Sequence, residues 1–230
     1  MIAEKLANTL ALDYPPERLE ILVASDGSSD GTNEIVAQIA QTTPTVRLFA
    51  LPRQGKNRTL NAVVPEATGE VLVFSDADSM LTPDALRQLV APLADPSVGG
   101  VGGDYHYPTE VAEGKGERSY WSVDRLTKRL QSQGGSMTSA TGQIYAIRQT
   151  LWRPVALSVT DDFYTSVQVI AAKQRLVFEP QAVATGPIAA SADKEFQRKV
   201  RVMMRGLHGV WLSRRLLNPF EYGFYAVQLL

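Results

Sequence analysis

Residues 19–41, LEILVASDGSSDGTNEIVAQIAQ, place a strand pattern, a polar turn and a helix pattern in direct succession. The run 19–25 is short, apolar and followed by turn-forming residues, which is typical of a buried strand. Apolar residues then recur at helical spacing over 32–41, on one face of a helix. A strand that leads at once into a helix is the repeating unit of α/β proteins, so this segment sets the expected fold class.

Strand and helix patterns of this kind alternate along the chain. Strands are expected at 46–51, 70–78, 98–107 and 175–185, and helices at 2–12, 56–65, 82–94, 116–133 and 161–174. A loop of small residues, 134–143, separates two of these elements. We therefore expect an α/β three-layer sandwich with a mostly parallel sheet. Ligands of such sheets bind beyond the carboxyl ends of the strands.

Composition narrows the chemistry that this fold can carry. The 230 residues have an ordinary globular composition and a net charge of −1, so nothing favours nucleic acid as a partner. There are no cysteines, which excludes disulfides, thiolate catalysis and cysteine-bound zinc. The two histidines, His106 and His208, are too few for a histidine metal cluster. Any metal would be held by oxygen, which favours a hard ion such as Mn²⁺ or Mg²⁺.

The two ends of the chain carry little targeting information. The start, MIAEKLANTL, lacks the basic region and long apolar core of a signal peptide. No apolar run approaches the roughly 18 residues needed to span a bilayer, so the chain is expected to be soluble or peripheral. Residues 224–230, FYAVQLL, stop within an apolar run, which indicates a truncated end.

The turn from Asp26 to Thr32 has several interpretations. A polar turn with a helix cap explains its serines and glycines, but not an acid at the strand tip. A Walker phosphate loop needs Lys-Ser or Lys-Thr after its last glycine, whereas Thr32 and Asn33 follow Gly31. The dinucleotide fingerprint GxGxxG is absent. A calcium loop needs a glutamate at its twelfth place, which is Ala37 here.

A second acidic stretch, FSDADS at 74–79, points to a ligand. Asp76 and Asp78 are two residues apart at the end of an expected strand, so both side chains should project to the same side. Paired carboxylates repel each other, but they suit a divalent cation that also holds phosphate oxygens. Between the acidic stretches lies GKNRTLN, in which Lys56 supplies a point charge suited to phosphate.

Taken in order, these pieces resemble the inverting glycosyltransferases of family 2, which bind nucleotide-sugars with a GT-A fold. The resemblance extends from LALDYPPERLEILVASDGSSDGT through GKNRTLNAV, VFSDADSMLTPDAL, TGQIYAIR and VTDDF to RKVRVMMRG. It implies that Asp26 contacts the nucleotide and that Asp76 and Asp78 form the DxD motif. In that motif the first acid faces the nucleotide and the second reaches the metal on the diphosphate.

The stretch Thr160 to Asp162 resembles the TED-like motif of the family, which implies that Asp162 is the general base, with Asp161 beside it. Displacing a diphosphate needs charge neutralisation, which a metal and Lys56 would supply. A base then takes the proton from the attacking hydroxyl on the opposite face, and no protein nucleophile is needed. Two acids in the first turn of a helix also suit the helix dipole, so a purely structural interpretation stays open.

Three features depart from the family pattern. Family members begin with an apolar strand that ends in a PxYNE-like turn, part of the nucleotide-base pocket, whereas this chain begins at the helix expected to follow. Ser25 stands where the family often has a second Asp before Asp26. The processive synthases carry a QxxRW-like motif, and the nearest match, RKVRV at 198–202, has Val in place of Trp. This argues against a cellulose, chitin or hyaluronan synthase.

The segment 195–211 is expected to be a helix with two distinct faces. Its basic stripe consists of Arg198, Arg201, Arg205 and His208, and its apolar face of Val200, Met203, Met204, Leu207 and Trp211. Three interpretations are open. In the first, the helix packs on the core and its charged face is solvated. In the second, Arg198 and Arg201 bind the diphosphate or the acceptor. In the third, the helix lies on an anionic membrane.

The expected function is a metal-dependent, inverting transfer of a sugar from a UDP-linked donor to a hydroxyl of a glycan or lipid-linked acceptor. One catalytic domain would span 1–230, with a donor half at 1–110 and an acceptor and base half at 111–230. It would work in the cytoplasm at the inner face of the membrane, with peripheral contact through 195–230. The alternatives are an inactive fragment acting as a binding module and a sugar-phosphate nucleotidyltransferase, whose glycine-rich, Arg-containing loop is absent here.

Overall fold

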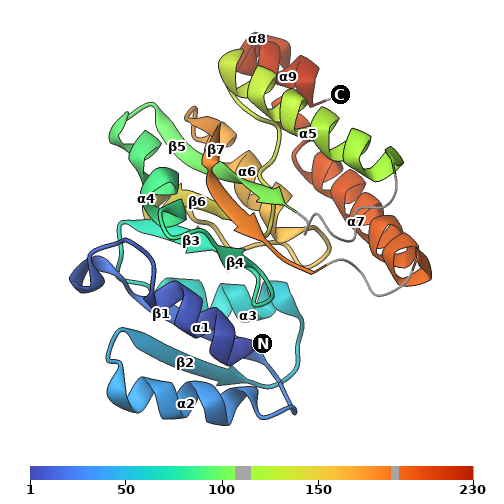
Figure 1. Cartoon of the computed structure of the whole chain (residues 1–230). Helices are drawn as coiled ribbons and strands as arrows, with labels where there is room; N and C mark the ends of the chain where they lie inside the picture. The colour runs from blue at the N-terminus through green and yellow to red at the C-terminus, as the bar shows by residue number, and fades with distance from the viewer. Residues whose placement is uncertain (107–114, 188–191, 230) are drawn as a thin grey trace.

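The computed structural model describes residues 1–106, 115–187 and 192–229 (Figure 1). Its strands are β1 (Ile21–Asp26), β2 (Val46–Leu51), β3 (Val71–Phe74), β4 (Met80–Leu81), β5 (Val98–His106), β6 (Tyr145–Arg148) and β7 (Arg175–Thr185). Its helices are α1 (Ile2–Leu10), α2 (Thr32–Thr42), α3 (Lys56–Val63), α4 (Ala85–Val90), α5 (Lys115–Gln133), α6 (Asp161–Ala171), α7 (Ala192–Leu212), α8 (Pro219–Tyr222) and α9 (Phe224–Gln228). The α/β class expected from the sequence is confirmed.

The strands form a five-stranded sheet in the order β3-β6-β5-β7-β4 and a separate parallel pair, β1-β2. The ladder between β5 and β7 is parallel, whereas β6 runs antiparallel to both β3 and β5, and β4 runs antiparallel to β7. The described sheet is therefore mixed rather than mostly parallel. The short strands β4 and β6 follow turns and loops and not crossover helices. A parallel neighbour needs such a crossover, so these two strands run antiparallel to the strands beside them.

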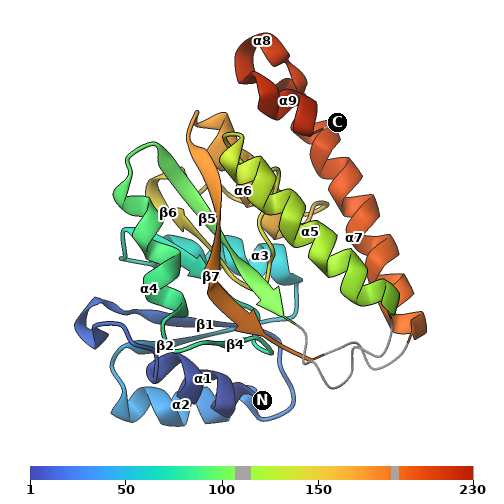
Figure 2. The ribbon, with the colours of Figure 1, turned by 45° about the horizontal axis from the view of Figure 1, so that its top comes forward.

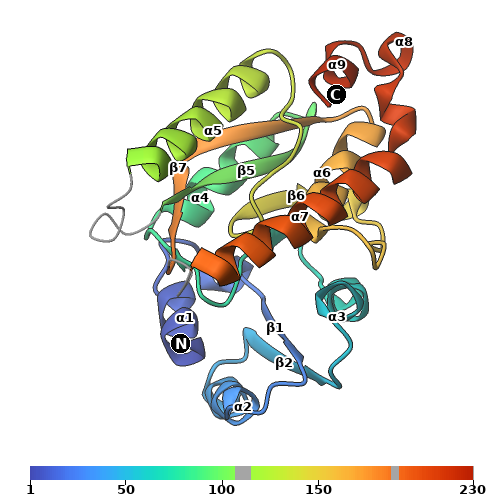
Figure 3. The same ribbon diagram turned by 90° about the vertical axis from the view of Figure 1, so that its right-hand side faces the viewer.

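Side chains alternate between the two faces of this sheet and build a core on each. In β6, Ala146 belongs to the core that includes Leu89 of α4, whereas Tyr145 and Ile147 belong to the core that includes Val167 of α6. Helix α4 therefore covers one face and α6 the other, as Figures 2 and 3 show from two sides. This gives the three layers expected of the sandwich.

Strand β1 is only half-buried along most of its length, although the sequence predicts a fully buried strand. Its ladder is to β2, and both pack against α1 and α2 through a small core of Leu6, Val36 and Val46. Among the described strands β1 has no ladder on its other edge, which leaves its side chains less covered than those of β5.

The C-terminal helices α7, α8 and α9 gather with α5 on one side of the molecule (Figures 1 and 2). Met203, Leu207 and Trp211 of α7 are 59–67% exposed. The apolar face expected to pack on the core therefore lies in solvent, and α7 packs on α6 through the buried Gly209 instead. Within the described residues, no helix is both long and apolar enough to cross a membrane.

Candidate active site

Lys56 joins three segments that are far apart in the sequence. Its Nζ lies 3.0 Å from Oδ1 of Asp76 and 3.1 Å from Oδ2 of Asp161. Lys56 is the first residue of α3, Asp76 follows β3, and Asp161 is the first residue of α6. The structure thus brings together three of the residues singled out in the sequence, at the ends of three different elements.

The charge of Lys56 is stabilised by these partners. Burial by itself would lower the pKa of Lys56, but the carboxylates of Asp161 and Asp76 offset this and raise it above the ordinary lysine value. A cation in the first turn of a helix is unfavourable because the helix dipole is positive there. The two acids therefore explain why a lysine is stable at the start of α3, and Lys56 keeps its positive charge at neutral pH.

Asp76 and Asp78 lie in a turn and not in a strand. Strand β3 ends at Phe74, and the turn is closed by the Ser79 amide, which donates to the Asp76 carbonyl at 3.1 Å. The prediction of a strand over 70–78 is wrong at this end, so the argument from strand alternation does not apply. The turn instead sets the directions of the two carboxylates.

Lys5 of α1 is a buried residue next to this turn that the sequence analysis missed. Its ammonium donates to the Ser79 carbonyl and to Oγ of Ser75 at 2.7 Å, and the residue is 8% exposed. Burial lowers the pKa of Lys5 to about 8, although the carboxylates of Asp76 and Asp78 oppose the shift. A helix pattern alone gives no signal that its one buried cation faces an acidic turn.

The two acids at the start of α6 have different surroundings. Asp161 is buried and pairs with Lys56, whereas Oδ1 of Asp162 accepts a hydrogen bond from the Phe163 amide at 2.7 Å. Burial, and then the negative charge of Asp161, raise the pKa of Asp162 above the ordinary aspartate range. A Cβ on Gly142 would lie 3.1 Å from Oδ2 of Asp162, so the loop before β6 closely approaches this carboxylate.

Asp26 holds the loop that precedes α3. Its carboxylate accepts hydrogen bonds from the Gln54 amide at 2.7 Å, the Gly55 amide at 2.9 Å and Oγ1 of Thr59 at 3.1 Å. The backbone amide of Gln54, followed by that of Gly55, lowers the pKa of Asp26. The acid at the tip of the first strand therefore fixes the start of α3, and with it Lys56.

Two asparagines of α3 hold the segment that leads into α6, and the sequence analysis missed both. The Asn57 amide donates to the carbonyls of Ala156 and Val159 at 2.7 and 3.0 Å. The Asn61 side chain donates to the Val155 carbonyl at 2.9 Å and accepts from the Val155 amide at 2.7 Å. They lie one helical turn apart on one face of α3, and this spacing was visible in GKNRTLN. Helix α3 thereby positions the start of α6.

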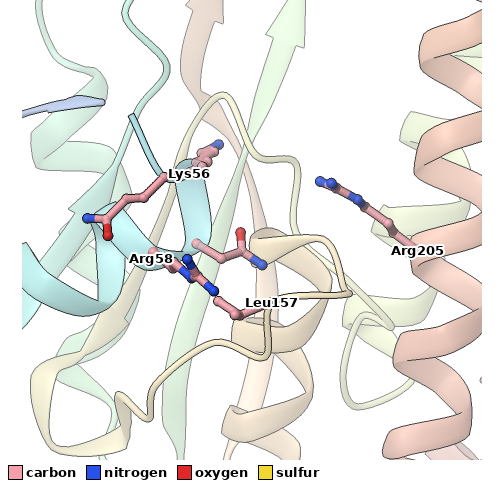
Figure 4. Close-up of a pocket in the computed structure, with 7 residues that line it drawn as sticks. Lys56, Arg58, Leu157 and Arg205 are labelled. Atoms are coloured by element: carbon pink, nitrogen blue, oxygen red, sulfur yellow. The ribbon is translucent and has the colours of Figure 1, made fainter. Parts of the chain in front are cut away.

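A pocket of about 340 Å³ opens beside Lys56. It is lined by residues 54–58, Leu157 and Arg205. Figure 4 shows the Arg205 side chain extending from α7 toward α3. Arg201 lies on α7 and is exposed, but does not line this pocket, and the side chain of Arg198 lies outside the described residues. The basic stripe thus reaches the pocket through Arg205, one turn later than expected.

The N-terminal two-thirds of the chain show which protein family it belongs to. Residues 1–153 match the model of glycosyl transferase family 2. The chain belongs to this family. Poly-beta-1,6-N-acetyl-D-glucosamine synthase of Staphylococcus aureus is 26% identical over 218 residues, which cover 92% of this chain and 52% of that protein. The Staphylococcus epidermidis protein of the same name is 24% identical over the same lengths. This family 2 chain spans about half the length of these relatives.

Solved structures support the GT-A fold of this family 2 glycosyltransferase. The mannosyltransferase PcManGT of Pyrobaculum calidifontis, in complex with GDP-Man and Mn²⁺, superposes with a TM-score of 0.78 and 24% identity, over 99% of this chain and 65% of that one. TarS of Staphylococcus aureus, in complex with UDP-GlcNAc, gives a TM-score of 0.62 and 16% identity, over 83% of this chain and 55% of that one. The fold class expected from the sequence is confirmed.

The carboxylates of Asp76 and Asp78, in the turn 75–79 (the DxD turn), are of the oxygen type that a hard divalent cation prefers. In the described part of the chain, no group of three or more His, Cys, Asp or Glu side chains gathers around one point. Mg²⁺ is commonly held by one or two carboxylates together with substrate phosphates and water, and carboxylates also suit Mn²⁺. Asp76 and Asp78 would supply such a partial set of oxygen ligands.

Replacing Asn57 with Ala tests the connection between α3 and the start of α6. The change leaves the carbonyls of Ala156 and Val159 without their donor, so we expect the free energy of unfolding to fall by about 1–3 kcal/mol. Chemical denaturation measures this. Arg58→Ala, at an exposed neighbouring position, is the control and should change stability by no more than about 0.5 kcal/mol. Equal stability of Asn57→Ala and the parent protein would contradict the role given to Asn57.

Proposed function

We propose that this domain transfers a sugar from a nucleotide diphosphate-sugar to an acceptor hydroxyl, in one displacement that inverts the anomeric carbon. The observation that carries the proposal is the contact of Lys56 with both Asp76 and Asp161. It joins a carboxylate turn suited to a metal-diphosphate with the helix start that carries Asp162. The residues proposed to bind the leaving group therefore lie next to the residue proposed as the base, and the two roles fall on different residues.

On the donor side, Lys56, Asp76 and Asp78 bind the diphosphate and its cation. Asp26 acts on nucleotide binding by holding the loop at 54–55 in place. A bound Mn²⁺ or Mg²⁺ would neutralise the charge that develops on the leaving diphosphate. Arg205 adds positive charge to the pocket beside Lys56, and Arg198 and Arg201 belong to the same basic stripe. Because a guanidinium can bind phosphate with two parallel hydrogen bonds, this stripe suits a diphosphate.

On the acceptor side, Asp162 takes the proton of the attacking hydroxyl. Its raised pKa makes it a stronger base than an exposed aspartate, which improves proton transfer. Asp161 is held by Lys56 and acts as a positioning residue. Assigning the two acids in this way follows from their different surroundings.

The donor is proposed to be UDP-linked and the acceptor a glycan or a lipid-linked sugar. The TarS complex with UDP-GlcNAc and the poly-N-acetylglucosamine synthases support this choice, and the PcManGT complex keeps GDP-Man as the comparison donor. Mn²⁺ is the cation named for PcManGT, while Mg²⁺ suits the same oxygen ligands.

We place the domain at the cytoplasmic face of a membrane, in contact through residues 195–230. Residues 196–220 contain no Asp or Glu, and their cations are Arg198, Lys199, Arg201, Arg205, Arg214 and Arg215. The same segment exposes apolar side chains, including Met203 and Trp211. Positive charge combined with exposed apolar residues on a helix is the pattern that binds anionic lipid surfaces.

Asp78→Asn tests the donor site. UDP with Mn²⁺ should raise the melting temperature of the parent protein, because a ligand that binds only the folded state stabilises it. Asp78→Asn should lose the Mn²⁺-dependent part of this shift, with a melting temperature without ligand close to that of the parent. Asp84→Asn, an exposed acid at the start of α4, is the matched control and should keep the full shift. A full Mn²⁺-dependent shift in Asp78→Asn would show that this carboxylate holds no metal.

Asp162→Asn tests the base. Turnover should fall about 10²–10⁴-fold with nucleotide affinity nearly unchanged, since the amide keeps the size of the side chain but accepts no proton. In the parent protein kcat should fall as pH drops through the raised pKa of Asp162, and the variant should lose this acid limb. Asp161→Asn should cost less. A nearly normal Asp162→Asn enzyme beside an inactive Asp161→Asn enzyme would reverse the assignment.

The exposed face of α7 generates a third test. Met203→Ser combined with Met204→Ser should weaken sedimentation with vesicles of phosphatidylglycerol and phosphatidylcholine several-fold, because apolar insertion is reduced. Ile35→Ser on α2 is the distant control. Binding should also fall as salt rises, since the cations of α7 are screened. Unchanged vesicle binding by the double variant would exclude α7 as the membrane contact.

A further inference from the structure

A buried lysine lies directly behind the DxD turn. Lys5 is almost fully buried in α1, and its ammonium donates to the Ser79 carbonyl and to Oγ of Ser75. Lysine is rarely buried to this degree unless its charge is paired, because removing an ammonium from water is costly. Two neutral acceptors satisfy its donors only in part, which indicates that another interaction favours the charge at this position.

The two acceptors of Lys5 bracket the two acids. Ser75 directly precedes Asp76, and Ser79 directly follows Asp78. The ammonium therefore ties together the two ends of a turn whose middle carries like charges. Because carboxylates at this spacing repel each other, a cation held behind them favours the closed turn.

One helical turn further along α1, Asn8 makes a second contact with the same segment. Its side chain accepts from the Leu81 amide at 2.8 Å and donates to the Leu81 carbonyl at 2.9 Å. These bonds anchor β4, which lies beyond the turn, and they involve no charge. Lys5 and Asn8 thus share a helix face but act on different parts of the segment.

We infer that Lys5 is a positioning residue for the DxD turn, and that its ammonium holds Ser75 and Ser79 so that Asp76 and Asp78 bind a divalent cation together with the donor diphosphate. The inference rests on the proposed function. It assigns to α1 a role in donor binding that none of the sequence motifs indicates. It also gives a role to the buried charge, since removing an ammonium from water is costly.

The test compares the UDP affinities of Lys5→Met and Asn8→Ala. Calorimetry measures each affinity twice, once with Mn²⁺ present and once with EDTA. Met keeps the length of the side chain and removes the buried charge, but it leaves the buried Ser79 carbonyl without its donor. We therefore expect Lys5→Met to lose stability to about the same extent as Asn8→Ala, which removes the partner of Leu81. Its Mn²⁺-dependent UDP affinity should fall about tenfold or more, since hydrogen bonds from a charged donor are lost. UDP binding in EDTA should be unchanged.

Asn8→Ala, as the matched control, should lose a similar amount of stability but keep nearly normal Mn²⁺-dependent affinity. Parent-like affinity in Lys5→Met would overturn the inference, as would a loss of stability that accounts for the whole effect. If Lys5→Met does not fold, Lys5→Arg is decisive, because a guanidinium cannot occupy the position of a compact ammonium between the two acceptors. Parent-like affinity in Lys5→Arg then overturns the inference. Absence of any Mn²⁺ dependence in the parent protein would instead refute the proposed function.

Discussion

The contact of Lys56 with Asp76 and Asp161 is the interaction on which the arrangement of the site depends. The two acids come from the turn after β3 and from the start of α6, and without a cation between them they would face each other as like charges. A partly exposed ion pair contributes little to stability. Its effect here is geometric, because it fixes the ends of β3, α3 and α6 relative to one another. The remaining contacts of α3, through Asn57 and Asn61, reinforce the same geometry.

The acids of this region are differentiated by their partners and not by their residue type. Asp26 is occupied by backbone amides, Asp30 accepts from the amide and hydroxyl of Thr32 at the start of α2, and Asp161 is occupied by Lys56. Among the described residues, Asp162 has no cation within ion-pair distance, and burial raises its pKa. A carboxylate with no ion pair and a raised pKa is suited to accept a proton, which supports Asp162 as the base of the proposed function. Thus one residue type holds a loop at Asp26, closes a turn at Asp30 and is a candidate base at Asp162.

Much of this site could be predicted because strand ends converge in α/β sheets. Asp76 was identified at the end of an expected strand, Lys56 as a point charge between the two acidic stretches, and Asp161 beside the base that the family resemblance implies. The structure brings the three together. Lys5 could not be identified, since its partners are a backbone carbonyl and a serine some 70 residues away. The direction of the DxD carboxylates also escaped prediction, because a turn replaces the last residues of the strand. Contacts between side chains and distant backbone leave no periodic signal in a sequence.

Helix α7 has one side exposed to solvent and another side that lies against the candidate site. A Cβ on Gly209 would lie 2.8 Å from the ring of Phe163, so α7 passes directly over the residue that follows Asp162. One turn earlier, Arg205 lines the pocket beside Lys56. On the proposed function, a lipid surface that binds the exposed side of α7 would therefore lie near both the donor pocket and the base. Such a geometry suits an acceptor anchored in the membrane better than a freely diffusing one, because the anchor would limit the approach of the hydroxyl to the side where Asp162 lies.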